Sequence, residues 1–325
     1  DVVLEMKDVK VEIETRSGTF TALDLEHLAI NRGETIALVG ETGSGKSMTA
    51  SAIMKLFPTK KASLSQGSIL FDGMDLIKMS EKKMEELRGK SMTMIFQDPM
   101  TSLNPVFAIG EPMIKMIQKH LGLKKQEARA KAIEALSFVG LPDPIGLLKR
   151  YPHELSGGQR QRVMIAMAMA CQPKLLIADE PTTALDVTIQ SQILYLLNKM
   201  KESSGTSILF ITHNLSVVSH IADTIVIMYG GHVVETGPTK KVFKNPKHPY
   251  TKMLMDAIPR LHETREKLPV IEGIIDRSLT GCPFFNRCPN AQSACHTQGM
   301  PKLTTFEDQH KAACYYPIGE VPQHV

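Results

Sequence analysis

Two long segments near the start of the chain alternate between apolar and polar residues. They read VLEMKDVKVEIET from Val3 and TALDLEHLAI from Thr21. A period of two sends successive side chains to opposite faces of a strand, so one face can be buried while the other meets solvent. The two segments therefore predict antiparallel strands.

Later apolar runs are short and do not alternate. They are TIALV at residues 35–39, LLIAD at residues 175–179 and a run ending in FIT at residue 212. Continuous runs of this length are typical of strands buried on both faces of a parallel sheet. Together with helical segments between them, they predict an α/β fold.

Two further patterns add a helix and a turn. The stretch EARAKAIEALSFVG, residues 127–140, ends in glycine and has apolar residues at helical spacing, namely Ala128, Ala132, Ile133, Leu136 and Val139. This spacing predicts an amphipathic helix that stops at Gly140. The pair Gly230 and Gly231, set between two apolar runs, predicts a hairpin turn.

The run at residues 35–39 leads into GETGSGKS and then into a segment of helical character. A strand, GxxxxGK[ST] and a helix in this order predict a P-loop, whose backbone N–H groups surround phosphate oxygens at a helix N-terminus. Lys46 is expected to reach the terminal phosphates, and the Ser47 hydroxyl to hold Mg²⁺. The residues predicted to bind nucleotide here are Gly40, Glu41, Thr42, Gly43, Ser44, Gly45, Lys46, Ser47 and Met48.

Two carboxylates follow the apolar run that begins at Lys174. Asp179 and Glu180 stand where a buried parallel strand delivers side chains to its carboxyl edge, the usual position of ligands in open α/β sheets. Asp179 is predicted to hold Mg²⁺, directly or through other ligands. Glu180 points to the opposite side and is predicted to polarise a water for attack on the γ-phosphate.

A pentapeptide, LSGGQ, opens another apolar helix. The Ser156 hydroxyl and the amides of the two glycines that follow can donate hydrogen bonds to an anion at the helix N-terminus. The residues of this motif are Leu155, Ser156, Gly157, Gly158 and Gln159.

With these motifs the chain resembles the ATP-binding subunits of ATP-binding cassette (ABC) transporters, for which LSGGQ is the family signature. Three more segments match the family in order. They are IFQDP with Gln97, PTTALD with the loop residues Ala184, Leu185 and Asp186, and FITHNL with His213. The resemblance covers nearly the whole chain. It implies a P-loop NTPase fold with an antiparallel β subdomain and a helical insert at about residues 98–160.

The family's design implies a split active site. Two cassettes face each other head to tail, and each ATP lies between the P-loop of one and LSGGQ of the other. The resemblance implies that Glu180 is the general base and that His213 contacts the γ-phosphate and orients the attack. Gln97 would join Ser47 and Asp179 around Mg²⁺. Only one set of motifs is present, so a second, paralogous ABC ATPase subunit is expected.

One feature of the family is missing from its usual place, the aromatic residue on which adenine stacks. The stretch ETRSGTF offers Arg16, whose guanidinium can form a platform, or Phe20. Both alternatives stay open.

The chain continues past the last expected strand. NPKHPYTKMLMDAIPR from Asn245 and QDPMTSLNP from Gln97 are typical of the oligopeptide and dipeptide importer branch, although nickel and other solute importers share them. We therefore predict a nucleotide-binding domain over residues 1–240 and a C-terminal extension over residues 241–325. The extension shows little apolar periodicity, so a small, irregular domain of this kind needs a staple.

Four of the five cysteines lie in the extension, with the spacing Cx5Cx6Cx18C. Disulfides are disfavoured because the ATPase half belongs in the reducing cytosol. Zinc is open, but its cysteines usually come in pairs about two to four residues apart. A [4Fe-4S] cluster accepts four thiolates from irregular loops, and ATPases of the resembled branch carry a similar set that holds one. The predicted cluster ligands are Cys282, Cys288, Cys295 and Cys314, and thiols without any ligand are the remaining alternative.

Two histidines and the fifth cysteine remain to be considered. In the zinc alternative, His296 or His310 could replace a thiolate. Cys171 sits in an apolar helix and is expected to be a small buried residue.

Composition limits the location and the partners. The net charge is +4 without a Lys/Arg run, so no nucleic-acid partner is expected. No apolar run approaches the roughly 18 to 20 residues that cross a bilayer, and the first residues lack the layout of a signal peptide. We expect a peripheral protein at the cytoplasmic face of the inner membrane. Its partners would be two transmembrane permease subunits and, indirectly, an extracytoplasmic solute-binding protein.

The expected function is ATP hydrolysis that powers import of dipeptides or oligopeptides, with ATP, Mg²⁺ and a [4Fe-4S] cluster as cofactors. The first alternative is an importer of nickel or another small solute. A soluble ribosome-associated ABC ATPase fits less well, because that family has two cassettes in one chain and its cysteines at the front. The interval from Ser47 to Leu155 is too short for the long coiled coil of chromosome and DNA-repair ATPases.

Overall fold

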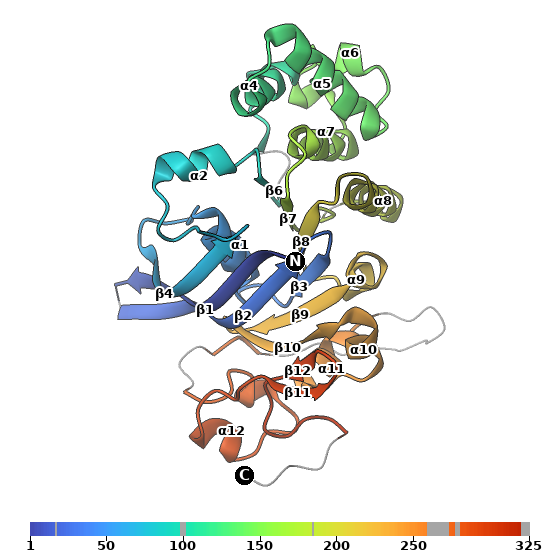
Figure 1. Ribbon diagram of the computed structural model, residues 1–325. Coiled ribbons are helices and arrows are strands. Elements are labelled where there is room, and N and C mark those ends of the chain that lie inside the picture. Colours follow the sequence, from blue (N-terminus) through green and yellow to red (C-terminus); the bar gives the residue numbers. More distant parts are fainter. Residues whose placement is uncertain (17, 98–101, 184, 259–272, 277–279, 320–325) are drawn as a thin grey trace. The chain divides into compact units, whose positions relative to one another are not determined.

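The computed structural model describes residues 1–325 except 17, 98–101, 184, 259–272, 277–279 and 320–325 (Figure 1). The chain divides into two compact units. We call residues 1–3, 30–34 and 78–211 the helical unit, and residues 4–29, 35–77 and 212–325 the P-loop unit. The boundary predicted at residue 240 does not separate these units, and it stays a prediction about family architecture.

An antiparallel sheet forms the first part of the P-loop unit. Its strand order is β2-β1-β4-β5, with β1 (Val2–Thr15), β2 (Gly18–Asn31), β4 (Ala62–Phe71) and β5 (Met74–Asp75). β1 buries Leu4 and Met6 on one face, and Leu4 pairs with Phe71 of β4. The alternating pattern at the start of the chain is thus confirmed as antiparallel strands.

A second group of strands in the P-loop unit carries the P-loop. β3 (Thr35–Val39) is parallel to β9 (Thr224–Tyr229), followed in order by β10 (His232–Pro238), β12 (His310–Ala312) and β11 (Thr304–Glu307). The hairpin predicted between β9 and β10 is confirmed. Gly230 and Gly231 have φ of 59° and 95°, the left-handed conformations that a two-residue turn of this kind needs.

Short helices accompany these strands. They are α1 (Lys46–Met54), α9 (Leu215–Ile221), α10 (Thr239–Lys244), α11 (Pro249–Asp256) and α12 (Ala294–Thr297), with a 3-10 turn, η2, at Phe285–Arg287.

The helical unit holds three parallel strands in the order β6-β7-β8, namely β6 (Met92–Ile95), β7 (Leu175–Asp179) and β8 (Ser207–Thr212). β7 is buried along its whole length, as its continuous apolar run predicts. The helices are α2 (Glu81–Leu87), α4 (Gly110–Leu121), α5 (Lys125–Phe138), α6 (Pro144–Leu147), α7 (Gly157–Met169) and α8 (Val187–Ser204), with a 3-10 turn, η1, at Pro152–Glu154.

The predicted amphipathic helix is α5. Ala128, Ala132 and Leu136 are buried on one face, and Gly140 follows the helix in the left-handed conformation at φ 68°. A glycine there ends a helix without the steric penalty of a side chain. Both the helix and its stop are therefore confirmed.

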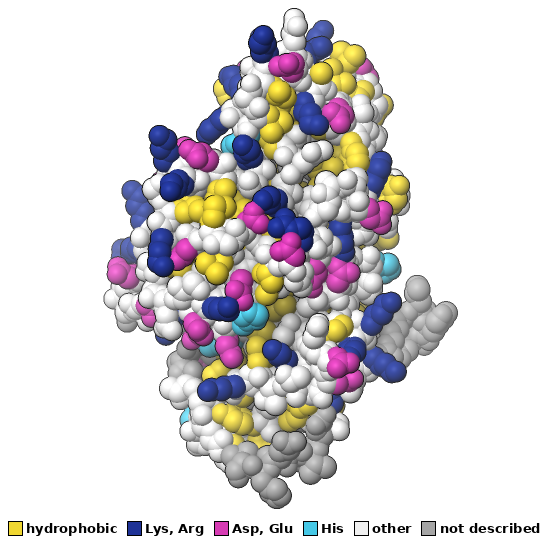
Figure 2. Space-filling model, viewed as in Figure 1, with side chains coloured by type: hydrophobic (Ala, Val, Ile, Leu, Met, Phe, Trp, Pro, Cys, Tyr) yellow, Lys and Arg dark blue, Asp and Glu magenta, His cyan; other side chains and the backbone are white. Residues whose placement is uncertain are grey.

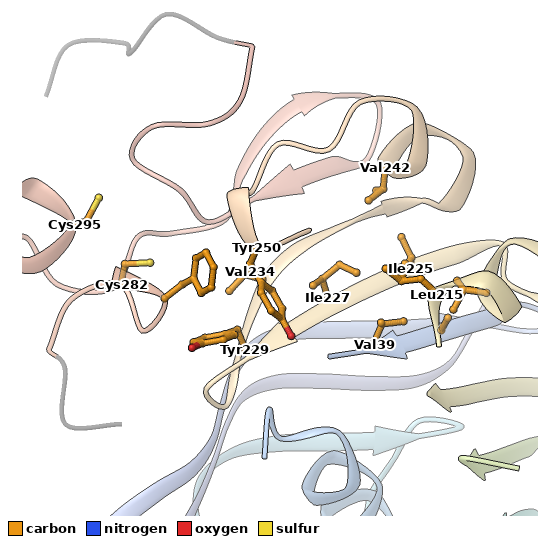
Figure 3. Packing of buried hydrophobic residues seen from close by; sticks show 13 residues of the cluster. Val39, Leu215, Ile225, Ile227, Tyr229, Val234, Val242, Tyr250, Cys282 and Cys295 are labelled. Atoms are coloured by element: carbon orange, nitrogen blue, oxygen red, sulfur yellow. The ribbon is translucent and has the colours of Figure 1, made fainter. Parts of the chain in front are cut away.

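The C-terminal extension packs into an apolar core that its sequence pattern does not reveal. Figure 3 shows Tyr229 and Tyr250 beside Cys282, with Val39 of β3 in the same cluster. The Tyr229 ring lies 4.7 Å from that of Tyr250 and 5.1 Å from that of Phe284, centroid to centroid, in edge-on contacts. The extension therefore contributes to a buried core even though its sequence shows little apolar periodicity.

None of the described helices combines the length and apolar character required of a membrane span. Basic and acidic side chains are interspersed over the face drawn in Figure 2.

Candidate nucleotide site and cysteine pocket

The P-loop connects the end of β3 to the start of α1. Gly43 and Gly45 have φ of 82° and 108°, which a side chain would strain. Gly40 is required for a different reason: a Cβ there would lie 2.3 Å from the Met228 carbonyl oxygen and 2.6 Å from the Ser44 hydroxyl. Backbone geometry thus explains each glycine of the motif.

Lys46 opens α1 and is almost fully buried. Its ammonium donates hydrogen bonds to the carbonyl oxygens of Gly40 at 2.6 Å and Glu41 at 2.9 Å. The positive charge is therefore held within the loop, next to the N-terminal end of the helix, where anions are favoured. Ser47 lies exposed in the first turn of α1.

In the helical unit, β7 delivers the two predicted carboxylates. Asp179 is 7% exposed at the end of the strand. Glu180 follows it with φ 48°, a left-handed conformation that costs a non-glycine residue about 1–3 kcal/mol. Its N–H donates to the carbonyl oxygen of Ile211 at 2.9 Å, a contact that helps to hold this conformation.

The structure brings the predicted Gln97 and Glu180 together. The Gln97 amide donates to Glu180 Oε2 at 2.9 Å, and the Thr183 hydroxyl donates to the same oxygen at 2.9 Å. Thr183 belongs to the PTTALD segment, but the sequence pattern assigns it no role. The two donors orient the Glu180 carboxylate, a group that can accept a proton from water.

The signature motif begins α7 with a capping box. The Ser156 hydroxyl accepts from the Gln159 N–H at 3.2 Å, and the Gln159 side-chain oxygen accepts from the Ser156 N–H at 3.0 Å. Residues 156–159 line a hollow of about 480 Å³ together with Leu185 and Asp186. Two predicted motifs therefore share one surface of the helical unit, whereas Ala184 lies outside the described residues.

The structure also places four more of the predicted residues, His213, Arg16, Phe20 and Asp186. His213 follows β8 and is exposed, Arg16 is exposed after β1, and Phe20 is half-buried in β2. Asp186 caps α8 by accepting from the Ile189 N–H at 2.9 Å. The roles assigned to them stay predictions.

All four cysteines of the extension line one pocket. None of the five cysteines, all of which lie among the described residues, is in a disulfide, and Cys171 is buried as predicted. Burial raises the pKa of Cys282 to about 11 and that of Cys314 to about 12, and it also raises the pKa of Cys288. These thiols stay protonated at neutral pH unless a positive charge such as a metal favours the thiolate.

The pocket is small as it stands. Its cavity measures about 10 Å³, roughly the space of one water, so a metal centre requires the lining loops to move outward. Among the described residues, no three His, Cys, Asp or Glu side chains form a ready set of metal ligands. The predicted metal centre is therefore not confirmed by this geometry.

The two histidines considered for a zinc site are engaged elsewhere. His296 is exposed and packs against the Phe285 ring at 5.3 Å between centroids. His310 is fully buried, with its Nε2 2.7 Å from Glu235 Oε1. Neither lines the cysteine pocket.

His248 lines the pocket instead. Its Nδ1 accepts from the Tyr250 N–H at 3.1 Å, which assigns the remaining ring proton to Nε2. Burial lowers the pKa of His248 to about 4, so the ring is neutral at pH 7. The buried Nε2–H has no acceptor among the described residues. A neutral donor without a partner thus lies at the wall of a pocket lined by four thiols.

A last set of contacts joins the extension to the P-loop. Arg287 donates to both carboxylate oxygens of Glu41, at 2.8 and 3.1 Å, and to the Tyr229 hydroxyl at 2.9 Å. The Tyr250 hydroxyl accepts from the Glu41 N–H at 2.9 Å. No local pattern in the sequence signals these contacts, because Arg287 and Glu41 are 246 positions apart.

Comparison with known proteins gives the family. Residues 23–183 match the family described as ABC transporter, and residues 234–295 match the oligopeptide/dipeptide transporter C-terminal region. The dipeptide transport ATP-binding protein DppD of Bacillus subtilis is 43% identical over 96% of this chain and 94% of its own length. The oligopeptide transport ATP-binding protein OppD of Salmonella typhimurium is 44% identical over 99% of this chain and 96% of its own.

A solved structure supports the same class. A dimeric ATP-binding cassette in a post-hydrolysis state, bound to ADP and Pi, is 26% identical with a TM-score of 0.65. The match covers 73% of this chain and 98% of that one. The chain belongs to the ATP-binding subunits of ABC transporters, of the oligopeptide/dipeptide type. It is an ABC ATPase with the P-loop fold that the sequence predicts.

Proposed function

We propose that this ATPase powers a membrane importer of dipeptides or oligopeptides. The observation that carries the proposal is the C-terminal match at residues 234–295, together with relatives named for peptide transport that align along nearly the whole chain. The segment with the importer-like sequence around His248 is part of the buried core and contacts the P-loop, so it is built into the ATPase.

The catalytic roles in this proposal follow the motifs. ATP binds to the P-loop, with Lys46 on its terminal phosphates and the signature residues of a second cassette closing over it. Ser47, Gln97 and Asp179 offer the oxygen ligands that Mg²⁺ prefers. Glu180 accepts the proton of the attacking water, and its hydrogen bond from Gln97 supports this role. His213 contacts the γ-phosphate.

The proposal includes two permease subunits, a paralogous second ATPase and, indirectly, an extracytoplasmic binding protein. The helical unit exposes large apolar side chains that such partners would cover: Val106 is 74% and Ile145 53% exposed. Figure 2 shows hydrophobic side chains reaching the surface at the top of the view, where Figure 1 places α4 to α6. Exposed apolar patches often mark contacts with other proteins, here at the cytoplasmic face of the membrane.

Transport in a reconstituted assembly tests the proposed cargo. The chain, its paralogue, both permeases and the binding protein are placed in liposomes, and ATP hydrolysis and uptake are measured with a dipeptide, a longer peptide and Ni²⁺. We expect peptide to stimulate both hydrolysis and uptake, and Ni²⁺ to stimulate neither. Stimulation by Ni²⁺ alone would reassign the cargo to the small-solute alternative.

We also propose that the cysteine pocket binds a [4Fe-4S] cluster. The four thiols match the number and type of its ligands, and they share one pocket. The unpartnered Nε2–H of His248 suits an anionic acceptor, such as a metal-bound thiolate or sulfide. Such a centre would supply a structural staple to the extension. ATP hydrolysis transfers no electrons, so no redox step is assigned to it.

Metal analysis of anaerobically purified protein tests this second proposal. We expect iron and acid-labile sulfide in equal amounts with broad visible absorbance, and their loss in Cys314→Ser. Cys171→Ser is the matched control, because Cys171 lies outside the pocket, and it should keep the iron. Zinc without iron would support the zinc alternative, and protein free of both metals would contradict any metal role.

A further inference from the structure

Two residues of the C-terminal extension hold Glu41 through three hydrogen bonds. The Arg287 guanidinium donates hydrogen bonds to both carboxylate oxygens of Glu41. The Tyr250 hydroxyl accepts a hydrogen bond from the Glu41 backbone N–H. The Arg287 side chain is 6% exposed and that of Glu41 28%, so this paired contact is shielded from solvent far more than an ordinary surface ion pair.

The same residue touches the nucleotide lysine. The Glu41 carbonyl oxygen accepts from the Lys46 ammonium at 2.9 Å. Glu41 therefore lies between Arg287 on one side and Lys46 on the other, at the second position of the P-loop. A shift of its backbone changes both the position of a loop amide and the partner of the ammonium.

Other groups of the extension hold Arg287 and Tyr250 in place. Arg287 ends the turn η2 directly before Cys288, and this turn is fixed by hydrogen bonds from Phe285 N to Cys282 O and from Arg287 N to Phe284 O, both 3.0 Å. Tyr250 packs edge-on against Tyr229, whose hydroxyl accepts from Arg287. The contacts of Arg287 and Tyr250 with Glu41 thus depend on aromatic packing and on the backbone of the cysteine segment.

We infer that Arg287 and Tyr250 are positioning residues for nucleotide binding, and that through them the cysteine segment forms part of the P-loop's support. Preorganised loop amides and a fixed lysine bind phosphates without the ordering that a loose loop requires. The inference rests on ATP binding at the P-loop, but the contacts are made by protein groups alone. It can therefore be tested whether or not the pocket binds iron.

The test compares the affinity of purified full-length variants for a fluorescent ATP analogue. Arg287→Gln and Glu41→Gln each remove the charged pair, and we expect about tenfold weaker binding in each. The double variant should bind no more weakly than either single variant, because both changes break the same contact. Tyr250→Phe keeps the ring packing and removes only the acceptor of the Glu41 N–H, and it should also weaken binding.

Controls separate positioning from general stability. Lys241→Gln breaks an exposed ion pair with Asp308 in the same unit and should leave nucleotide affinity unchanged. Thermal unfolding is followed for every variant, and a charge-reversed pair, Arg287→Glu with Glu41→Arg, should regain affinity lost in the single changes. Where Arg287→Gln does not fold, Tyr250→Phe decides the question.

Two results would overturn the inference. The first is wild-type affinity in folded Arg287→Gln and Tyr250→Phe. The second is a double variant whose loss equals the sum of the single losses, since additive effects mean that Arg287 and Glu41 act independently.

Discussion

Replacing Glu180 by glutamine is expected to lower ATP turnover by about 10²–10⁴-fold while leaving ATP binding nearly unchanged. Glutamine has the same size and can still accept hydrogen bonds from Gln97 and Thr183, which hold the native side chain at 2.9 Å. It cannot take a proton from water. ATP-bound pairs of cassettes should therefore form and persist, because the step that removes the γ-phosphate is blocked.

Single-turnover hydrolysis and size-exclusion chromatography with ATP measure the two parts of this prediction. Glu134→Gln provides a control in the same unit. Glu134 forms an exposed ion pair with Lys131 on α5, and the variant should hydrolyse ATP normally. Turnover close to wild type in Glu180→Gln would show that another group accepts the proton.

Replacing Glu235 by alanine is expected to lower the free energy of unfolding by about 3–5 kcal/mol. The carboxylate is fully buried and accepts from the N–H groups of Lys247 at 2.7 Å and His248 at 2.8 Å. It also lies 2.7 Å from Nε2 of the fully buried His310. Its removal leaves three buried polar groups without their partner.

Chemical denaturation of the full chain measures this loss. Glu235→Gln should lose less, because an amide oxygen can still accept from the two backbone N–H groups. Glu307→Ala, an exposed change on β11, should alter stability by less than about 0.5 kcal/mol. A loss below about 1 kcal/mol in Glu235→Ala would mean that the buried carboxylate does not organise this region.

Local chemistry explains why much of the nucleotide site could be predicted from the sequence. The apolar run of β3, the glycines after it and the helix that begins at Lys46 are neighbours in the chain, and each has a steric or electrostatic reason visible in a short window. The pairing of Gln97 with Glu180 follows from parallel strands that end at one edge. The roles predicted for Gln97, Glu180 and His213 come from the resemblance to the family.

The extension resisted prediction because its structure depends on distant partners. β12 pairs with β10, and His310 meets Glu235 across 75 positions of sequence. The aromatic residues of its core are spaced irregularly, so they show neither a helical nor a strand period. The number of thiols can be read from the sequence. That His248, rather than His296 or His310, lines their pocket cannot.

The most direct measurement is a cryo-microscopy map of the complete transporter with the Glu180→Gln chain, loaded with ATP and Mg²⁺. We expect one triphosphate to lie against Lys46 and another, bound by the partner cassette, to lie against Ser156. A fully loaded assembly in which neither residue approaches a triphosphate would contradict the claim that ATP joins two cassettes across their seam.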